Sequence, residues 1–129
     1  MTRSLSLQVL VSEFAIVRLP PDAGLPWWAA NSAELLSHTR SVQETSIVCE
    51  ARRVPEGVQA ARGYRALRVE GTLPFQATGV LASLAAPLTT ASVPVFVIST
   101  FDTDYVLVPA TLLATAVQAL RGAGHSVAE

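Results

Sequence analysis

Apolar and polar positions in the first part of the chain fall into short runs. Residues 5–11 (LSLQVLV) alternate at first between apolar and polar, which is typical of a strand with one buried face. Residues 14–19 (FAIVRL) form a second β-prone run, and three prolines with a glycine then break the pattern. Residues 27–36 (WWAANSAELL) predict one or two helical turns. This part of the chain therefore reads as two strands followed by a short helix.

A hairpin and a divider come next. Residues 35–40 (LLSHTR) and 45–51 (TSIVCEA) are β-prone and predict two strands joined by a turn at residues 41–44. Residues 54–63 (VPEGVQAARG) combine proline, glycine and mixed charge, and they predict a boundary between two units. Five arginines are spread over this segment and the following strand with acids among them, and they are interpreted as a solvated face: Arg52, Arg53, Arg62, Arg65 and Arg68.

The second half of the chain begins with a strand and a helix. Residues 64–71 (YRALRVEG) suit a strand. A helix is expected after it, with Thr78 in the N-cap position and Pro87 limiting its second half. Its apolar residues share one face at helical spacing: Val80, Leu81, Leu84 and Leu88. A buried helix is the expected product of this pattern.

Two more strands and a second helix follow. Residues 93–99 (VPVFVIS) are typical of a buried strand, and residues 105–108 (YVLV) form another after a turn. A second helical stripe lies between Pro109 and Gly122, which are ordinary helix punctuation. Its members are Leu113, Ala116, Val117 and Leu120. Residues 125–129 (HSVAE) predict a short last strand.

The order β-α-β-β-α-β predicts a ferredoxin-like α+β fold, with helices on one face of an antiparallel sheet. Residues 58–129 would form one such unit. Residues 1–57 contain strands, one short helix and a hairpin, and they predict a reduced version of the same unit. A weak internal echo supports this, because a serine and a nearby threonine (SHT at residues 37–39, ST at residues 99–100) are followed by an acid and an apolar strand in both halves.

Composition excludes several classes of function. Nine arginines and lysines against ten acids give a net charge of −1, so no basic stripe is present to neutralise nucleic-acid phosphates. Cys49 is the single cysteine, which excludes an internal disulfide. With only His38 and His125 besides, a zinc site would lack ligands. We therefore expect no cofactor and no nucleic-acid partner.

One uncharged stretch is long enough to cross a membrane. No charged residue occurs between Glu70 and Asp102. Three prolines lie within it, however, and its pattern changes from helical to β-prone, so a buried helix and strand are expected instead. Glu13 and Arg18 interrupt any secretory signal. We expect a cytoplasmic protein without a membrane partner.

Asp102 and Asp104 lie two residues apart between two apolar runs, so an extended chain would direct both side chains to one face. Three readings are open. The pair could hold a hydrated magnesium ion, although no histidine, cysteine or other acid occurs in the preceding thirty residues. Both could cap a tight turn. Asp104 could instead bind the ammonium group of a ligand.

The third reading has a partner in PFQATGVL, residues 74–81. A loop through Thr78 and Gly79 into a helix points backbone N–H groups outward at the positive end of the helix dipole. If this helix start lies beside the turn that carries Asp104, the two would hold the carboxylate and the ammonium of a free amino acid. Ordinary capping of a core helix fits the same residues.

These residues also carry a resemblance. VEG, TGVLASLAAPL and ISTFDTDYVLV occur in that order from Arg65 to about Gly124, and this stretch resembles the ACT-domain family in its aspartokinase-like branch. It is similar in particular to small stand-alone bacterial proteins with two ACT-like units. The resemblance implies ferredoxin-like units that pair within or between chains and bind small effectors, often amino acids, where they meet.

The resemblance also implies a set of ligand-binding positions. They lie in the loop before the first helix, in that helix and in the later turn: Pro74, Phe75, Gln76, Thr78, Gly79, Val80, Ser83, Leu84, Thr100, Phe101, Thr103 and Asp104. Ser83 and Leu84 would face the pocket of a partner unit, and Asp104 would take the amino or cationic group. Ala77 and its neighbours depart from the family pattern, in which relatives carry an acid.

Together these points predict a non-catalytic regulatory or sensor module that binds a small molecule, with an amino acid as the expected effector and a homodimer as the expected assembly. The alternative is a ligand-free pairing module that regulates a partner enzyme. A magnesium-dependent enzyme using the two aspartates is the third hypothesis, and it lacks a nucleophile or base.

Overall fold

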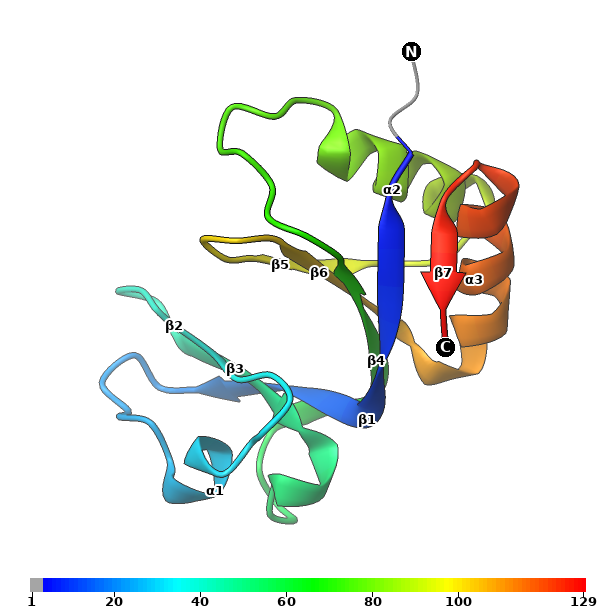
Figure 1. The fold of residues 1–129 in the computed structure, drawn as a ribbon. Coiled ribbons are helices and arrows are strands. Elements are labelled where there is room, and N and C mark those ends of the chain that lie inside the picture. Colours follow the sequence, from blue (N-terminus) through cyan, green and yellow to red (C-terminus); the bar gives the residue numbers. More distant parts are fainter. Residues whose placement is uncertain (1–3) are drawn as a thin grey trace. The chain divides into compact units, whose positions relative to one another are not determined.

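The computed structural model describes residues 4–129, which separate into two compact units. The first unit holds residues 4–10 and Arg65–Glu129, and the second holds Val11–Tyr64. Strands β1 (Ser6–Leu19) and β4 (Ala60–Val69) each contribute residues to both units (Figure 1). The predicted division into residues 1–57 and 58–129 places one cut in the chain, whereas each of these two strands runs through both units. The predicted division therefore stays a prediction.

The first unit has the predicted order of elements. After β4 come α2 (Val80–Thr90), β5 (Phe96–Ser99), β6 (Asp104–Pro109), the short 3₁₀ turn η2 (Ala110–Leu112), α3 (Leu113–Gly122) and β7 (Ser126–Ala128). Its strands lie in the order β7-β1-β4-β6-β5. This is a ferredoxin-like α+β arrangement with one addition: the first part of β1 lies between β7 and β4, and β7 runs parallel to it.

Period-2 patterns place the core of this unit on one face of the sheet. Alternate strand residues belong to this core: Leu7 and Val9 on β1, Leu67 and Val69 on β4, Val106 and Val108 on β6. Helices α2 and α3 pack against each other and cover this face with Leu84, Leu88, Ala116, Val117 and Leu120. The prediction of helices on one face of the sheet is confirmed.

A proline and a histidine together explain why α2 continues past Pro87 to Thr90. Proline has no N–H, so it leaves the carbonyl of Ser83, four residues earlier, without its helical donor. Nε2 of His125 lies 2.8 Å from that carbonyl oxygen. Because Nδ1 of His125 accepts the N–H of Leu5 at 3.0 Å, the proton is assigned to Nε2, which donates to Ser83. His125 is 3% exposed and ties α2 to the start of β1.

Strand β5 differs from its prediction. The apolar run that begins at Val93 predicted a buried strand, but β5 starts at Phe96 and lies at the end of the strand order. Val95 and Phe96 are partly exposed, whereas Val93 packs in the core. A strand with only one neighbour, β6, has fewer side chains to cover it, so an apolar sequence does not make it buried.

The second unit contains the rest of β1, α1 (Trp27–Ala30), β2 (Ser37–Arg40), β3 (Thr45–Glu50) and the 3₁₀ turn η1 (Ala51–Arg53). β3 pairs antiparallel with β1 and with β2, which confirms the predicted hairpin. The core again uses alternate strand residues, Ala15 and Val17 with Ile47 and Cys49. Trp28 of α1 covers them, whereas Trp27 is exposed.

The two predicted strands at residues 5–11 and 14–19 are a single strand, β1, of 14 residues. The polar pair Ser12 and Glu13 does not end it. The carboxylate of Glu34 accepts the backbone N–H groups of Val11 at 2.9 Å and Ser12 at 2.7 Å, so these donors are satisfied without a neighbouring strand. Glu34 therefore supports the middle of β1.

None of the helices in residues 4–129 combines the length and the hydropathy needed to cross a membrane.

Cys49 is fully buried, as its apolar setting in β3 predicted. Burial, and then the nearby carboxylate of Glu50, raise the pKa of its thiol to about 11. We expect that at pH 8 only about one thiol in a thousand is ionised, so an aromatic disulfide reagent reacts extremely slowly with the native protein. The absorbance of the released thiolate should rise only after denaturant is added. Because the chain has one cysteine, the signal has one source, and fast reaction without denaturant would contradict the buried position.

Candidate functional site

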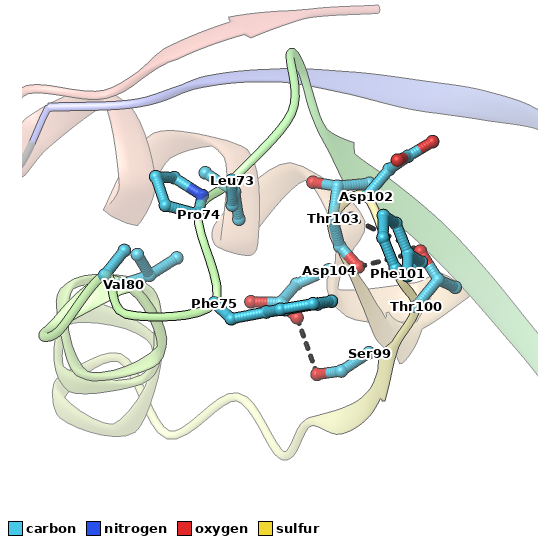
Figure 2. Close-up of a pocket in the computed structure, with 11 residues that line it drawn as sticks. Leu73, Pro74, Phe75, Val80, Ser99, Thr100, Phe101, Asp102, Thr103 and Asp104 are labelled. Atoms are coloured by element: carbon cyan, nitrogen blue, oxygen red, sulfur yellow. Dashed lines mark hydrogen bonds between the residues drawn. The ribbon is translucent and has the colours of Figure 1, made fainter.

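A small cavity of about 170 Å³ opens in the first unit, between the loop before α2 and the β5–β6 hairpin (Figure 2). It brings together the two segments that the sequence singled out. Its lining consists of Leu73, Pro74, Phe75, Ala77, Val80, Ser99, Thr100, Phe101, Asp102, Thr103 and Asp104. All of them belong to the same compact unit.

The hairpin fixes the position of Asp104. Ser99, the last residue of β5, pairs with Asp104, the first residue of β6, so residues 100–103 form the turn. The N–H of Thr100 donates to the carbonyl of Thr103 at 2.8 Å, and the N–H of Thr103 donates to the Thr100 hydroxyl at 3.2 Å. Asp104 is half-buried, and one of its carboxylate oxygens accepts the hydroxyl of Ser99 at 2.5 Å. The carboxylate is thereby held in one orientation.

Two hydrogen bonds hold the turn against the rest of the unit. The N–H of Leu73 donates to the carbonyl of Asp102 at 2.7 Å, and the buried hydroxyl of Thr103 donates to the carbonyl of Val69 at 2.7 Å. Further along the loop, the N–H of Ala77 donates to the carbonyl of Pro74 at 3.0 Å and closes a tight turn. The loop and the hairpin therefore form two of the walls of one cavity.

An aromatic pair spans these two walls. The rings of Phe75, on the loop, and Phe101, on the turn, meet edge to face with their centroids 4.9 Å apart. Both side chains are nevertheless highly exposed, 71% and 77% respectively. Both rings line the same cavity as Asp104 (Figure 2). The cavity thus combines one acid with a substantial apolar surface.

Helix α2 begins at the third wall, where Val80 is its first residue and lines the cavity. The N-cap is Gly79, with φ of 78°, so the prediction of Thr78 as N-cap is wrong. A left-handed conformation favours glycine, because a side chain would be strained there. Gly79 makes no side-chain cap, and its carbonyl accepts the N–H of Ser83 at 2.9 Å. Because Gly79 has no Cβ, a ligand could approach the backbone closely at the start of α2.

The two aspartates do not act as a pair. Figure 2 shows the carboxylate of Asp104 directed inward beside Ser99, whereas that of Asp102 is directed away from it. In residues 4–129 no group of three or more histidines, cysteines, aspartates or glutamates is placed to hold a metal ion. Asp102 holds the turn to the loop through its backbone carbonyl, which accepts the N–H of Leu73. This fits the hypothesis that Asp102 is a turn residue.

The structure brings most of the predicted ligand-binding residues together. Those that line the cavity are Pro74, Phe75, Val80, Thr100, Phe101, Thr103 and Asp104. Gln76, Thr78 and Gly79 lie in the same loop but outside the lining. Ser83 and Leu84 lie within α2, where Leu84 belongs to the core and the Ser83 hydroxyl donates to the carbonyl of Val80 at 2.8 Å. Their role toward a partner unit stays a prediction.

Four lining residues are absent from the predicted ligand-binding set: Leu73, Ala77, Ser99 and Asp102. Sequence reasoning had discussed Ala77 and Asp102 in other respects, but it missed Leu73 and Ser99 altogether. Ser99 could have been found from strand pairing, because the residue opposite Asp104 in a two-stranded hairpin is fixed once the turn length is known. Leu73 gave no such signal. Its position depends on the hydrogen bond from its N–H to Asp102, a contact between segments about thirty residues apart.

Two larger but shallow cavities lie in the second unit, around Arg52 and Arg62. Their basic groups are already engaged. Arg62 donates to the carbonyls of Ala51, Val54 and Pro55 at 3.2–3.3 Å, and Arg52 pairs with Glu50 at 3.3 Å. These arginines stabilise η1 and its neighbourhood, so the cavity of the first unit remains the better candidate.

Comparison with protein families supports the predicted resemblance. A family model described as "ACT domain" matches residues 59–122, and a second model, for an N-terminal domain, matches residues 12–57. A comparison with curated protein sequences finds no match. The crystal structure of a protein from Agrobacterium tumefaciens is 34% identical, with a TM-score of 0.91, and the alignment covers 98% of this chain and 93% of that one.

More distant structures share the fold. A protein of unknown function from Vibrio cholerae, titled a possible transport protein, is 19% identical over 94% of this chain and 91% of its own, with a TM-score of 0.76. The regulatory subunit of aspartate kinase from Thermus thermophilus, in its ligand-free form, is 11% identical over 94% of this chain and 99% of its own, with a TM-score of 0.66. The domain match and the similarity to the 34% identical protein together identify the chain as a member of the ACT-domain family.

Proposed function

We propose that this protein is a non-catalytic regulatory module that binds a free amino acid in the cavity of its first unit. The observation that carries the proposal is the meeting of Asp104 and the start of α2 around one small cavity. An acid and a helix N-terminus offer complementary partners for the two charged groups of a zwitterion. A cytoplasmic location and a homodimeric assembly belong to the same proposal.

Each end of the ligand has a partner in this arrangement. The carboxylate of Asp104 is half-buried and oriented by Ser99, so its second oxygen can accept an ammonium group in a partly desolvated setting. The first N–H groups of α2 carry the positive end of the helix dipole, which favours a carboxylate. The achiral Gly79 lets that carboxylate approach the backbone closely.

The relatives add to this proposal. One structural neighbour is a regulatory subunit of aspartate kinase, and another is an aspartokinase III from Escherichia coli in complex with aspartate and ADP. Catalysis has little support from the cavity, since its lining offers two divergent carboxylates and hydroxyls but no histidine, cysteine or lysine. A regulatory role fits such a lining better than an enzyme does.

Isothermal calorimetry against the twenty amino acids tests the proposal. We expect at least one to bind, and the variant Asp104→Ala to bind it about 30- to 100-fold more weakly, because a charge-assisted hydrogen bond is lost. Asp102→Ala is the matched control, since Asp102 lines the same cavity with its carboxylate directed away, and its affinity should stay within about threefold. Absence of heat with every amino acid would remove the proposed function.

A second candidate is a pairing module that regulates a partner enzyme without binding a ligand. The exposed apolar side chains Val95 and Phe96, near and on the terminal strand β5, favour it, as does the exposed Leu81 on α2. The two candidate functions predict different responses of the protein's melting temperature to added amino acids. A ligand at a hundred times its Kd stabilises a protein by about 2.7 kcal/mol, whereas a ligand-free module shows no shift with any amino acid.

A further inference from the structure

We infer that the cavity selects a small amino acid with an uncharged side chain, and that Phe75 and Phe101 form the wall that sets the size limit. The inference rests on the proposed function, and it adds the chemical class of the ligand. Three observations carry it: the volume of the cavity, the charges of its lining and the aromatic pair across its mouth.

The volume limits the size of the ligand. At about 170 Å³ the cavity is smaller than the roughly 300–1,000 Å³ of pockets for drug-sized molecules. A volume of this size suits a molecule smaller than a drug, such as a single amino acid with a short side chain. Alanine has six non-hydrogen atoms and valine eight. A short side chain therefore suits this cavity better than a long or aromatic one.

The charges of the lining exclude an acidic side chain. The lining contains Asp102 and Asp104, and none of the described residues that line it is basic. An aspartate or glutamate ligand would bring a second carboxylate into a cavity that already carries negative charge. No guanidinium or ammonium group is there to neutralise it, so repulsion and desolvation both oppose binding.

A basic side chain is also disfavoured, for a different reason. Asp104 is engaged by the α-ammonium group in the proposed pose, and the carboxylate of Asp102 is directed away. The remaining walls offer apolar side chains, such as Leu73 and Val80, and hydroxyl groups, but no further carboxylate. A second cation would lose its water without gaining a partner, which is costly. An apolar or hydroxyl side chain meets no such penalty.

The aromatic pair supplies the wall for that side chain. Phe75 and Phe101 contact each other, yet each exposes more than two thirds of its side chain. Exposed aromatic surface of this extent beside a cavity is typical of a site that awaits an apolar partner. Because the rings come from the loop and the turn, closure of both over one side chain would limit its length.

Calorimetry with a panel of single amino acids tests the inference: glycine, alanine, serine and valine against aspartate, glutamate, arginine, lysine and phenylalanine. We expect the best of the first group to bind at least about tenfold more tightly than any of the second. A tighter aspartate, arginine or phenylalanine overturns the inference and leaves the proposed function intact. Absence of binding by every amino acid overturns the proposed function as well.

Variants of the wall test the size limit separately. Phe101→Ala and Phe75→Ala should each improve leucine and phenylalanine relative to alanine by at least about fivefold, because the wall becomes shorter. Trp27→Ala is the control, since Trp27 is equally exposed, at 77%, but belongs to the second unit. Circular dichroism checks that each variant is folded. An unchanged ratio in both phenylalanine variants overturns the assignment of the wall.

Discussion

Replacement of Glu50 by alanine is expected to lower the free energy of unfolding by about 3–5 kcal/mol, a large part of the total for a small domain. The side chain of Glu50 is only 1% exposed. One carboxylate oxygen accepts the N–H groups of Ala33 at 3.0 Å and Glu34 at 2.8 Å, and the other pairs with Arg52 and Arg53 at 3.3 and 3.6 Å. Alanine would leave these donors without their acceptor in a buried setting.

Urea unfolding followed by circular dichroism measures this loss. The matched control is Glu56→Ala, because Glu56 lies in the same unit and is exposed, and its stability should change by less than about 0.5 kcal/mol. The variant Arg52→Ala should cost far less than Glu50→Ala, since the Arg52 side chain is mostly exposed. Equal stability of Glu50→Ala and the parent protein would show that the carboxylate is not needed there.

The same residue predicts a dependence on pH. Burial alone raises the pKa of Glu50, but the N–H groups of Glu34 and Ala33 and the Arg52 guanidinium outweigh it and hold the pKa below its ordinary value of 4.5. A lowered pKa means that the native state favours the carboxylate. Its stabilisation is complete above about pH 4.5 and is lost as the pH falls through the folded value. In Glu50→Gln this part of the acid destabilisation should be absent.

In the second unit, sequence patterns predicted the strands, but they did not predict the side-chain contacts that hold the strands and turns together. The β-prone run TSIVCEA identified β3, because such a run favours a strand whichever strands it pairs with. The arginines Arg52 and Arg62 were interpreted as a solvated face. Their partners are a buried acid and backbone carbonyls, and such contacts depend on how η1 folds back, which periodicity does not encode.

For the candidate site, the sequence predicted the two segments but only part of the lining. A β-α-β-β order allows the loop before α2 and the turn at Asp104 to lie at neighbouring ends of the layer, and in the structure both line the cavity. The pairing of Phe75 with Phe101 was not predicted. It depends on the path of the loop, which is fixed by hydrogen bonds such as that from Leu73 to Asp102.

Leu84→Ala is expected to destabilise the protein by about 2–5 kcal/mol, because Leu84 is 1% exposed in the core of the first unit. The resemblance to the family instead implies that Leu84 faces the pocket of a partner unit. A core location and a location facing a partner's pocket predict different results for Leu84→Ala. A core residue lowers the midpoint of urea unfolding, and it weakens ligand binding only as far as it unfolds the protein.

Leu81→Ala provides the control on the same helix, since Leu81 is about half exposed and should cost less than about 1 kcal/mol. Binding is then measured below the urea concentration at which Leu84→Ala begins to unfold. If affinity for the amino acid is retained there, Leu84 acts through the core. If affinity falls about tenfold while the midpoint of urea unfolding is unchanged, Leu84 contacts the ligand. In that case Leu84 is placed differently in the assembly that binds the ligand than in the single chain, where it is buried in the core.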